Sequence, residues 1–226
     1  MTAHQPIPPP LPARAAREAT AARRRLRVLI VDDHPAVRVG LQGLLDAEPD
    51  LSSVAAVATA RGALAEAERL TPDVAVVDYQ LGDRDGLTLA RQLKNLARPP
   101  RVLIYSAYAD APMTVAAVIA GADGIASKGG RGDDLCLAIR AVGAGRPALP
   151  TILPDALRAM AGRLDAGDVP IFAMLVHGTP ADEIADVLGI THDWLDARRW
   201  SILKRLTASP RLTRLRRPPP PQRTGR

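Results

Sequence analysis

The sequence predicts an α/β protein with a doubly wound parallel sheet, followed by a small all-α domain. Two observations lead to this prediction. Between residues 26 and 146, short apolar runs alternate with stretches of helical periodicity, and strands that are apolar on both faces are typical of a parallel sheet covered on both sides. From about residue 168 to 206 the periodicity is helical throughout. Five strand–helix units in the first stretch fit a five-stranded, flavodoxin-like domain.

The elements of the sheet domain follow in order along the chain. Strands are predicted at residues 28–31, 54–58, 74–77, 102–105 and 124–126, because these runs are short and apolar. Helices are predicted at residues 36–47, 61–70, 87–96, 112–120 and 133–142, where apolar residues recur at helical spacing.

Three short helices are predicted in the second domain. Gly178 ends the first of them, and Thr179 is expected to cap the second, with Pro180 at its first position. Gly189 ends the second helix and Thr191 caps the third. A tight turn between the last two helices is typical of a helix-turn-helix unit.

Composition and charge divide the chain into five segments. They are a disordered basic arm at 1–25, the sheet domain at 26–146, a linker at 147–165, the helical domain at 166–208 and a disordered, Pro- and Arg-rich tail at 209–226. The net charge is +6, but residues 28–197 carry −9, residues 1–27 carry +5 and residues 198–226 carry +10. The excess of positive charge lies at the two ends of the chain. It is therefore as compatible with solubilising tails as with a nucleic-acid partner.

Several classes of protein are excluded. No run of about 18 apolar residues and no signal-peptide pattern occurs, so we expect a cytoplasmic protein that does not span a membrane. The single cysteine, Cys136, excludes an internal disulfide framework and a cysteine-rich zinc site. The stretch Gly129-Gly130-Arg131-Gly132 lacks the spacing and the Lys-Ser/Thr ending of a phosphate-binding P-loop.

Polar residues with complementary chemistry end four of the predicted strands. They are Asp32 and Asp33 after the first, Asp78 after the third, Ser106 after the fourth and Lys128 after the fifth. Ligands bind beyond the carboxyl ends of such strands, and converging carboxylates suit Mg²⁺. A carboxylate beside that metal can accept a phosphoryl group, and we expect Lys128 to pair with an Asp while the site is empty. Each residue alone is typical of a cap, a turn or a solvated charge, and Asp83 and Asp85 are interpreted as loop residues.

Residues 26–146 resemble the receiver domain of bacterial two-component response regulators. The matching motifs are Val28-Leu-Ile-Val-Asp-Asp-His-Pro35, Asp73-Val-Ala-Val-Val-Asp78 followed by Asp85-Gly86, Tyr105-Ser-Ala-Tyr108, and Gly121-Ala-Asp-Gly124 before Lys128. The resemblance implies phosphorylation of Asp78 by a sensor histidine kinase, with Asp32, Asp33, Asp78 and the backbone carbonyl of Gln80 on the Mg²⁺ side. It also implies that Ser106 is the switch hydroxyl and that Lys128 binds the phosphoryl group.

Two positions depart from the receiver pattern. Gly82 replaces the usual proline after the phosphoacceptor, so the loop is less stiff. Ile125 replaces the aromatic residue that moves inward on activation in the family. Repacking around Ser106 can then involve only an aliphatic side chain, and Tyr105 and Tyr108 are interpreted as ordinary strand and loop residues.

Residues 164–206 resemble the DNA-binding domain of NarL/LuxR-type regulators. The closest matches are Glu183-Ile184-Ala185 and Ile202-Leu-Lys-Arg-Leu206. The resemblance implies that the third helix enters the major groove. The DNA contacts expected from it are Thr191, Leu195, Arg198, Arg199, Lys204 and Arg205. Asp193 and Asp196 stand where the family has lysines or polar donors, and Arg199 stands at an apolar core position.

Together these features predict a response regulator that is not an enzyme. We expect it to control transcription and to form a homodimer when phosphorylated. The alternative is a receiver-gated protein-interaction regulator whose degenerate helix-turn-helix no longer binds specific DNA. Phosphatases of the haloacid-dehalogenase type also combine an Asp nucleophile with Mg²⁺, Ser/Thr and Lys. Their nucleophile lies on the first strand and their Asp pair comes last, which is the reverse of the order found here.

Overall fold

The computed structural model describes residues 25–208 of the chain. The predicted tail at 209–226 and all but the last residue of the predicted arm at 1–25 therefore lie outside the described residues. Within residues 25–208, no helix is long and apolar enough to cross a membrane.

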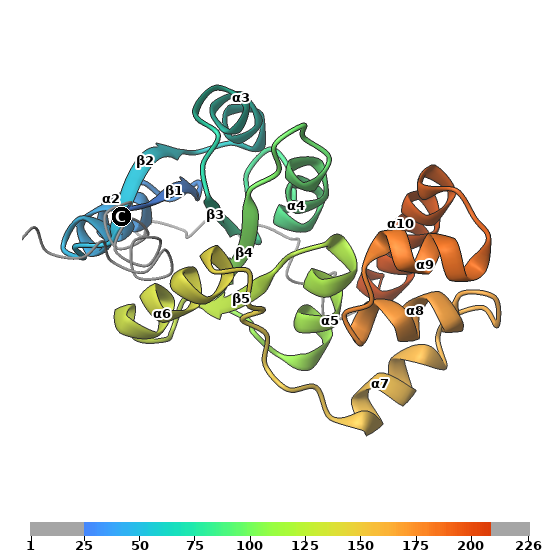
Figure 1. Cartoon of the computed structure of the whole chain (residues 1–226). Helices are drawn as coiled ribbons and strands as arrows, with labels where there is room; N and C mark the ends of the chain where they lie inside the picture. Colours follow the sequence, from blue (N-terminus) through green and yellow to red (C-terminus); the bar gives the residue numbers. More distant parts are fainter. Residues whose placement is uncertain (1–24, 209–226) are drawn as a thin grey trace, which may run out of the picture.

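A five-stranded parallel sheet forms the centre of the first domain, as predicted (Figure 1). Its strands are β1 (Leu26–Val31), β2 (Leu51–Val57), β3 (Val74–Asp78), β4 (Arg101–Ser106) and β5 (Gly124–Ser127), in the order β2-β1-β3-β4-β5. The edge strand β2 begins three residues earlier than predicted, at Leu51 instead of residue 54. Its two serines, Ser52 and Ser53, pair with β1 although they interrupt the apolar run, because an edge strand tolerates polar residues.

Helices cover both faces of the sheet. They are α2 (Pro35–Asp46), α3 (Ala60–Leu70), α4 (Gly86–Lys94), α5 (Ala111–Ala120) and α6 (Gly132–Gly143). Side chains of α3, α4 and α5 pack with one face of the sheet, and those of α2 and α6 pack with the other. Alternate residues of the buried strands serve the two faces, so Val77 belongs to one core and Val76 to the other.

The second domain consists of α7 (Pro154–Ala161), α8 (Val169–Val176), α9 (Ala181–Leu188) and α10 (His192–Thr207). Helix α7 lies inside the segment expected to be a linker, where Met160 is buried against the helical core. The cap of α9 is Pro180 and not Thr179, because Pro180 has an extended backbone (ψ 147°) and the helix starts after it. The predictions for Gly189 and Thr191 are confirmed, since Gly189 has a left-handed backbone and the Thr191 side chain accepts from Trp194 N.

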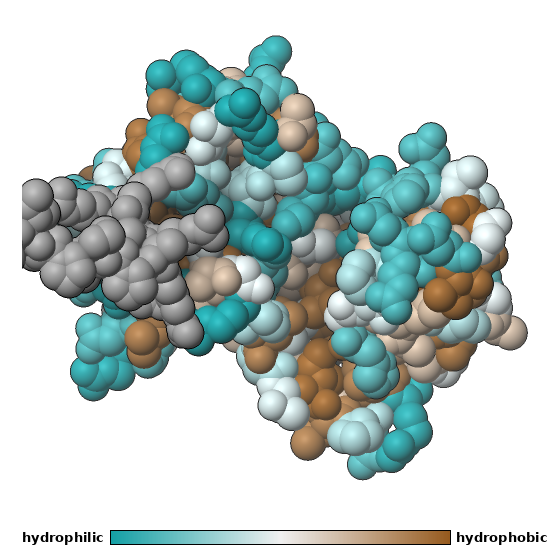
Figure 2. All heavy atoms as spheres, in the orientation of Figure 1, coloured by the Kyte–Doolittle hydropathy of each residue, from teal (hydrophilic) through white to brown (hydrophobic). Residues whose placement is uncertain are grey.

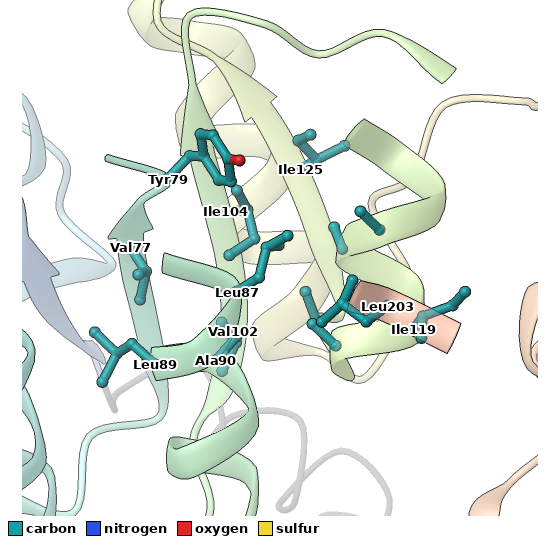
Figure 3. Close-up of a cluster of buried hydrophobic side chains, with 14 of the residues drawn as sticks. Val77, Tyr79, Leu87, Leu89, Ala90, Val102, Ile104, Ile119, Ile125 and Leu203 are labelled. Carbon is teal, nitrogen blue, oxygen red and sulfur yellow. The ribbon is translucent and has the colours of Figure 1, made fainter. Parts of the chain in front are cut away.

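The two domains share a core. Helix α10 packs against α5, and buried side chains of α8 and α10 belong to the same cluster as the sheet face covered by α3, α4 and α5. Figure 3 shows Leu203 of α10 beside Ile119 of α5. The face of α10 that carries Leu203 is therefore covered by the first domain (Figure 1).

The entry of α4 requires a glycine. A Cβ built on Gly86 lies 2.2 Å from the carbonyl oxygen of Asp78 and 2.9 Å from Tyr79 Cα. Both contacts are to backbone atoms, which no side-chain rotation can relieve. Gly86 also donates its N–H to Tyr79 O at 2.8 Å, so the loop between Asp78 and α4 is held tightly against the end of β3.

We therefore expect Gly86→Ala to lower the free energy of unfolding by about 2–3 kcal/mol, as overpacking does. Urea denaturation measures the effect. The matched control is Gly43→Ala in α2, where a Cβ meets nothing within 4 Å. That substitution should stabilise the chain by about 0.5–1 kcal/mol, because alanine is the better helix former. Equal effects of the two substitutions would contradict the steric argument.

Candidate functional site

Two nearly buried carboxylates lie together at the carboxyl edge of the sheet. Asp32 follows β1 and Asp78 ends β3, and the two strands are neighbours in the sheet. Asp32 is 1% exposed and Asp78 is 3% exposed. Ligand atoms of Asp32, Asp33, His34 and Asp78 all lie within 4.8 Å of one another. The structure thus brings together the three carboxylates that the sequence places at strand ends, and adds His34 to them.

The Lys128 ammonium bridges the two buried carboxylates. Its Nζ lies 2.7 Å from Asp32 Oδ2 and 2.9 Å from Asp78 Oδ2, which confirms the expected pairing. Burial acts to lower the pKa of Lys128, but the hydrogen bonds with Asp32 and Asp78 raise it overall. The ammonium also lies 5.6 Å from the centre of the Tyr105 ring. Lys128 is therefore a fixed cation between two carboxylates that would otherwise repel each other.

The surroundings of Asp78 shift the pKa of its carboxyl group. Burial raises its pKa, although the hydrogen bond and charge of Lys128 act in the opposite direction. Its Oδ1 accepts the backbone N–H of Gln80 at 3.2 Å. Buried ionisable groups with a shifted pKa and a specific charged partner are common at functional sites.

The donor set fits Mg²⁺. Asp32, Asp33 and Asp78 offer carboxylate oxygens at close range, and Mg²⁺ prefers such hard oxygen ligands. His34 holds the acids in place, since its N–H donates to Asp32 Oδ1 at 2.8 Å and its Nδ1 lies 2.7 Å from Asp33 Oδ1. The role of the Gln80 carbonyl stays a prediction; the structure places the neighbouring Gln80 N–H on Asp78.

Ser106 lies one strand away from Asp78. Ser106 is 1% exposed and ends β4, the strand that pairs with β3. The Ser106 hydroxyl oxygen accepts the N–H of Tyr108 at 3.1 Å and so orders the loop that leads to α5. Ile125 of β5 is buried in the core behind this loop (Figure 3), so the position of the usual aromatic residue holds a packed aliphatic side chain.

The two acids interpreted as loop residues lie in the loop between β3 and α4, and both accept N–H groups at the start of a helix. Asp83 accepts the N–H groups of Ala60 and Arg61 at 3.0 and 3.4 Å, at the start of α3. Asp85 caps α4 and accepts the N–H of Thr88 at 2.9 Å. The position of Asp85 directly before a helical stretch was a usable signal. The contact of Asp83 joins residues 22 and 23 positions apart, and no local pattern reveals it.

One residue predicted to contact DNA is contradicted by the structure. Leu195 is 1% exposed and packs in the helical core, because it lies on the face of α10 turned toward the other helices of its domain. Thr191 is exposed and acts as the cap of α10. A structural role thus accounts for both residues.

The cations of α10 have partners within the protein. Arg198 Nε lies 2.6 Å from Asp168 Oδ1, and Asp168 is fully buried. Arg205 lies 2.5 Å from Asp165, and Lys204 lies 5.3 Å from the centre of the Trp200 ring. Each of the four α10 cations that are predicted to contact DNA therefore has a partner within the described part of the protein: Arg198, Arg199, Lys204 and Arg205.

Arg199 connects the two domains. Its Nε and one terminal nitrogen donate to the carbonyl oxygen of Ile119, at 3.2 and 3.1 Å, near the C-terminal end of α5. A cation at this end of a helix is favourable with the helix dipole. The pKa of Arg199 is lowered, mainly because its guanidinium group is buried. A cavity of about 20 Å³ beside it is lined by residues of α4, α5 and α10, including Arg91, Asp196 and Trp200.

Lys128→Ala tests the electrostatic balance of the acidic site. The substitution leaves Asp32 and Asp78 without their cation, so we expect the free energy of unfolding in chelator to fall by about 3 kcal/mol. Added Mg²⁺ should restore part of this loss, because a ligand of the folded state stabilises it. Urea denaturation with and without Mg²⁺ measures both effects. The control is Lys94→Ala, which removes an ion pair with Asp123, and its loss should not respond to Mg²⁺. A Lys128 variant that is equally insensitive to Mg²⁺ would contradict the metal assignment.

Known proteins share this fold and domain order. The model of the response regulator receiver domain matches residues 28–140. The chain is similar to the DNA-binding transcriptional activator DevR/DosR of Mycobacterium tuberculosis, with 38% identity over 59% of this chain and 62% of that one. It is also similar to the nitrate/nitrite response regulator protein NarL of Escherichia coli, with 26% identity over 82% of this chain and 91% of that one.

A solved structure extends the likeness of fold across both domains. RcsB of Salmonella enterica serovar Typhimurium, solved bound to promoter DNA with a phosphomimetic, has a TM-score of 0.56 at 21% identity. The similarity covers 85% of this chain and 98% of that one. A family match over half of the chain, together with relatives of this kind, identifies the protein: it belongs to the response regulator receiver domain family and is of the NarL/LuxR type.

Proposed function

We propose that this response regulator controls transcription and that phosphorylation of Asp78 by a sensor histidine kinase switches it. The observation that carries the proposal is the Lys128 ammonium, held 2.7 Å from Asp32 and 2.9 Å from Asp78 at the carboxyl edge of the sheet. A nearly buried carboxylate with a fixed cation and neighbouring metal-binding acids is suited to accept a phosphoryl group. Homodimer formation on phosphorylation and a cytoplasmic location are part of the same proposal.

The residues have separate tasks in the transfer. As the P–N bond of the kinase phosphohistidine breaks, an O–P bond forms to an Asp78 carboxylate oxygen, and the histidine nitrogen keeps the electron pair. Asp32, Asp33 and Asp78, with the Gln80 carbonyl, would hold Mg²⁺, which supplies charge neutralisation for the phosphoryl oxygens when bound. Lys128 leaves Asp78 and pairs with a phosphoryl oxygen, and the Ser106 hydroxyl donates to another.

A physical path leads from Ser106 to α10. The Ser106 oxygen orders the loop that ends at Asp110, the cap of α5. When the hydroxyl turns toward the phosphoryl group, this loop and α5 move with it. Arg199 of α10 is bonded to Ile119 near the other end of α5. Phosphorylation can therefore shift the equilibrium between closed and separated domains, provided that the two states differ in their contacts with the phosphoryl group.

Asp78→Asn tests the phosphoacceptor. The amide keeps the shape of the side chain but removes the nucleophilic carboxylate, so a small-molecule phosphodonor with Mg²⁺ should no longer add a phosphoryl group. Intact-protein mass spectrometry measures the addition. Unfolding should not become easier, because burial raises the pKa of Asp78 and its ionised form is costly in the fold. The control Asp50→Asn changes an exposed acid paired with Arg140 and should leave labelling intact. Full labelling of the Asp78 variant would reject the assignment.

Arg199→Ala tests the link between the domains. The substitution removes two hydrogen bonds to Ile119, each worth about 0.5–1.5 kcal/mol. The separated state should therefore become about tenfold more populated in the unphosphorylated protein. Small-angle X-ray scattering should report a larger radius of gyration. The control Arg205→Ala breaks the pair with Asp165 within the second domain, and it should leave the radius unchanged. Identical scattering from both variants would contradict the proposal that the hydrogen bonds of Arg199 to Ile119 hold the two domains together.

A further inference from the structure

One histidine side chain lies among the acids at the carboxyl edge of the sheet, and the proposed phosphoryl transfer does not use it. His34 follows Asp33 directly, and its Nδ1 lies 2.7 Å from Asp33 Oδ1 and 3.4 Å from Asp32 Oδ1. One ligand atom from each of these residues and one from Asp78 all lie within 4.8 Å of one another. The imidazole nitrogen therefore belongs to the same group of donors as the three carboxylates.

The backbone of His34 has structural tasks, but its imidazole does not. The N–H of His34 donates to Asp32 Oδ1 at 2.8 Å, and its carbonyl oxygen accepts the N–H of Arg38 at 3.2 Å. His34 is the N-cap residue of α2, yet its side chain makes no capping hydrogen bond. The fold thus fixes the backbone of His34 and leaves its imidazole available to a ligand.

The Asp33 carboxylate is held differently from the other two. Lys128 Nζ lies 2.7 Å from Asp32 Oδ2 and 2.9 Å from Asp78 Oδ2. Asp33 Oδ1 is a buried atom that accepts no hydrogen bond from the described residues, although His34 Nδ1 lies beside it. A buried carboxylate oxygen without a hydrogen bond is costly. A metal ion shared with the imidazole would satisfy this oxygen.

The pair formed by Asp33 and His34 lies on the solvent side of the site. Their side chains are 34% and 66% exposed, whereas Asp32 and Asp78 are almost fully buried. Gly82, which has no side chain, borders Asp33 in the loop after β3, since a Cβ built on it lies 3.7 Å from Asp33 Oδ2. A metal ion at this pair can therefore enter from solvent and keep water ligands.

The chemistry of the donors decides which class of metal gains from the histidine. Mg²⁺ prefers oxygen ligands and keeps several waters, so an imidazole adds little to its binding. First-row transition metals such as Fe²⁺, Ni²⁺ and Zn²⁺ bind imidazole well. Three carboxylates beside the single ammonium of Lys128 also leave an excess of negative charge, which a divalent cation offsets.

We propose that His34 is a metal ligand and that its Nδ1, with carboxylate oxygens of Asp33 and Asp78, makes this site bind a divalent transition metal in preference to Mg²⁺. The inference rests on the metal site of the proposed function and adds a nitrogen ligand to it. On binding, the ring exchanges its contact with Asp33 for the shared ion. Asp32 stays in place, because Lys128 and the His34 N–H both hold it.

The experiment is calorimetric titration of the full chain, freed of metal, with Co²⁺ and separately with Mg²⁺. Co²⁺ also reports the type of its ligands through its visible absorption spectrum. His34→Ala removes the imidazole and keeps the backbone N–H that binds Asp32. His34→Asn keeps a hydrogen-bonding side chain beside Asp33 but has no imidazole nitrogen. Urea denaturation shows whether each variant is folded.

His192→Ala is the matched control. His192 Nε2 lies 2.7 Å from Asp182 Oδ1, the same distance as in the pair of His34 and Asp33. This second pair lies in the other domain, whose surface carries hydrophilic and apolar residues side by side (Figure 2). It is not part of a group of three or more metal-binding side chains within residues 25–208. The substitution should leave the binding of both metals unchanged.

The unmodified chain should bind Co²⁺ at least about tenfold more tightly than Mg²⁺. Both His34 variants should bind Co²⁺ about 10–100-fold more weakly, which is the loss typical of a disturbed metal site. The absorption spectrum of bound Co²⁺ should change to that of an all-oxygen ligand set. The affinity for Mg²⁺ should change by less than about threefold, because Mg²⁺ takes oxygen ligands.

Two results would overturn the inference. One is a His34→Asn variant that binds Co²⁺ as tightly as the unmodified chain, because a hydrogen bond beside Asp33 would then be the task of the imidazole. The other is a His192→Ala variant that loses as much Co²⁺ affinity as His34→Ala. Failure of the proposed function looks different, since a phosphodonor would then leave Asp78 unlabelled with either metal, whatever the titrations show.

Discussion

The burial of two carboxylates beside one ammonium group is the constraint on which the rest of the structure depends. Asp32 and Asp78 are almost fully buried, and Lys128 lies within 2.9 Å of both. Such an arrangement is costly unless every partner is in place. The parallel sheet keeps them in place because it aligns the ends of β1, β3 and β5 at one edge. The close approach of Gly86 to the end of β3 then fixes the loop around the site.

The sequence predicts this site well because each of its residues follows a strand. A strand is visible as a short apolar run, and the topology of a parallel sheet then brings the residues at the strand ends together. The same logic fails for Asp83, whose partners lie at the start of α3. It also fails for α7, a single short helix with one buried residue, Met160, since so little periodicity cannot be distinguished from a linker.

The contact between the domains is the part that no local pattern predicts. Arg199 stands at a position where the family has a core residue, and the sequence alone suggests a phosphate contact. In the structure its guanidinium reaches a carbonyl group 80 residues away, near the C-terminal end of α5. The error over Leu195 has the opposite cause. A groove-facing and a core-facing position differ by one residue on a helix, and the weak amphipathic pattern of α10, with Trp200 and Arg199 on its buried sides, does not show which is which.

The charged residues Asp196, Arg198 and Arg199 of α10 have partners within the protein. When a helix packs against a protein surface, cations on the covered side of the helix need partners, because an unpaired buried charge is costly. Here Arg198 and Arg199 are paired in the closed state, with Asp168 and with Ile119. Asp196 lies 3.7 Å from Arg199, one turn away on the same helix. Of these two cations only Arg199 holds α10 against the first domain, whereas Arg198 is paired within the second domain. A substitution at Arg199 therefore changes the contact between the two domains, whereas a substitution at Arg198 changes a pair inside the second domain and leaves that contact in place.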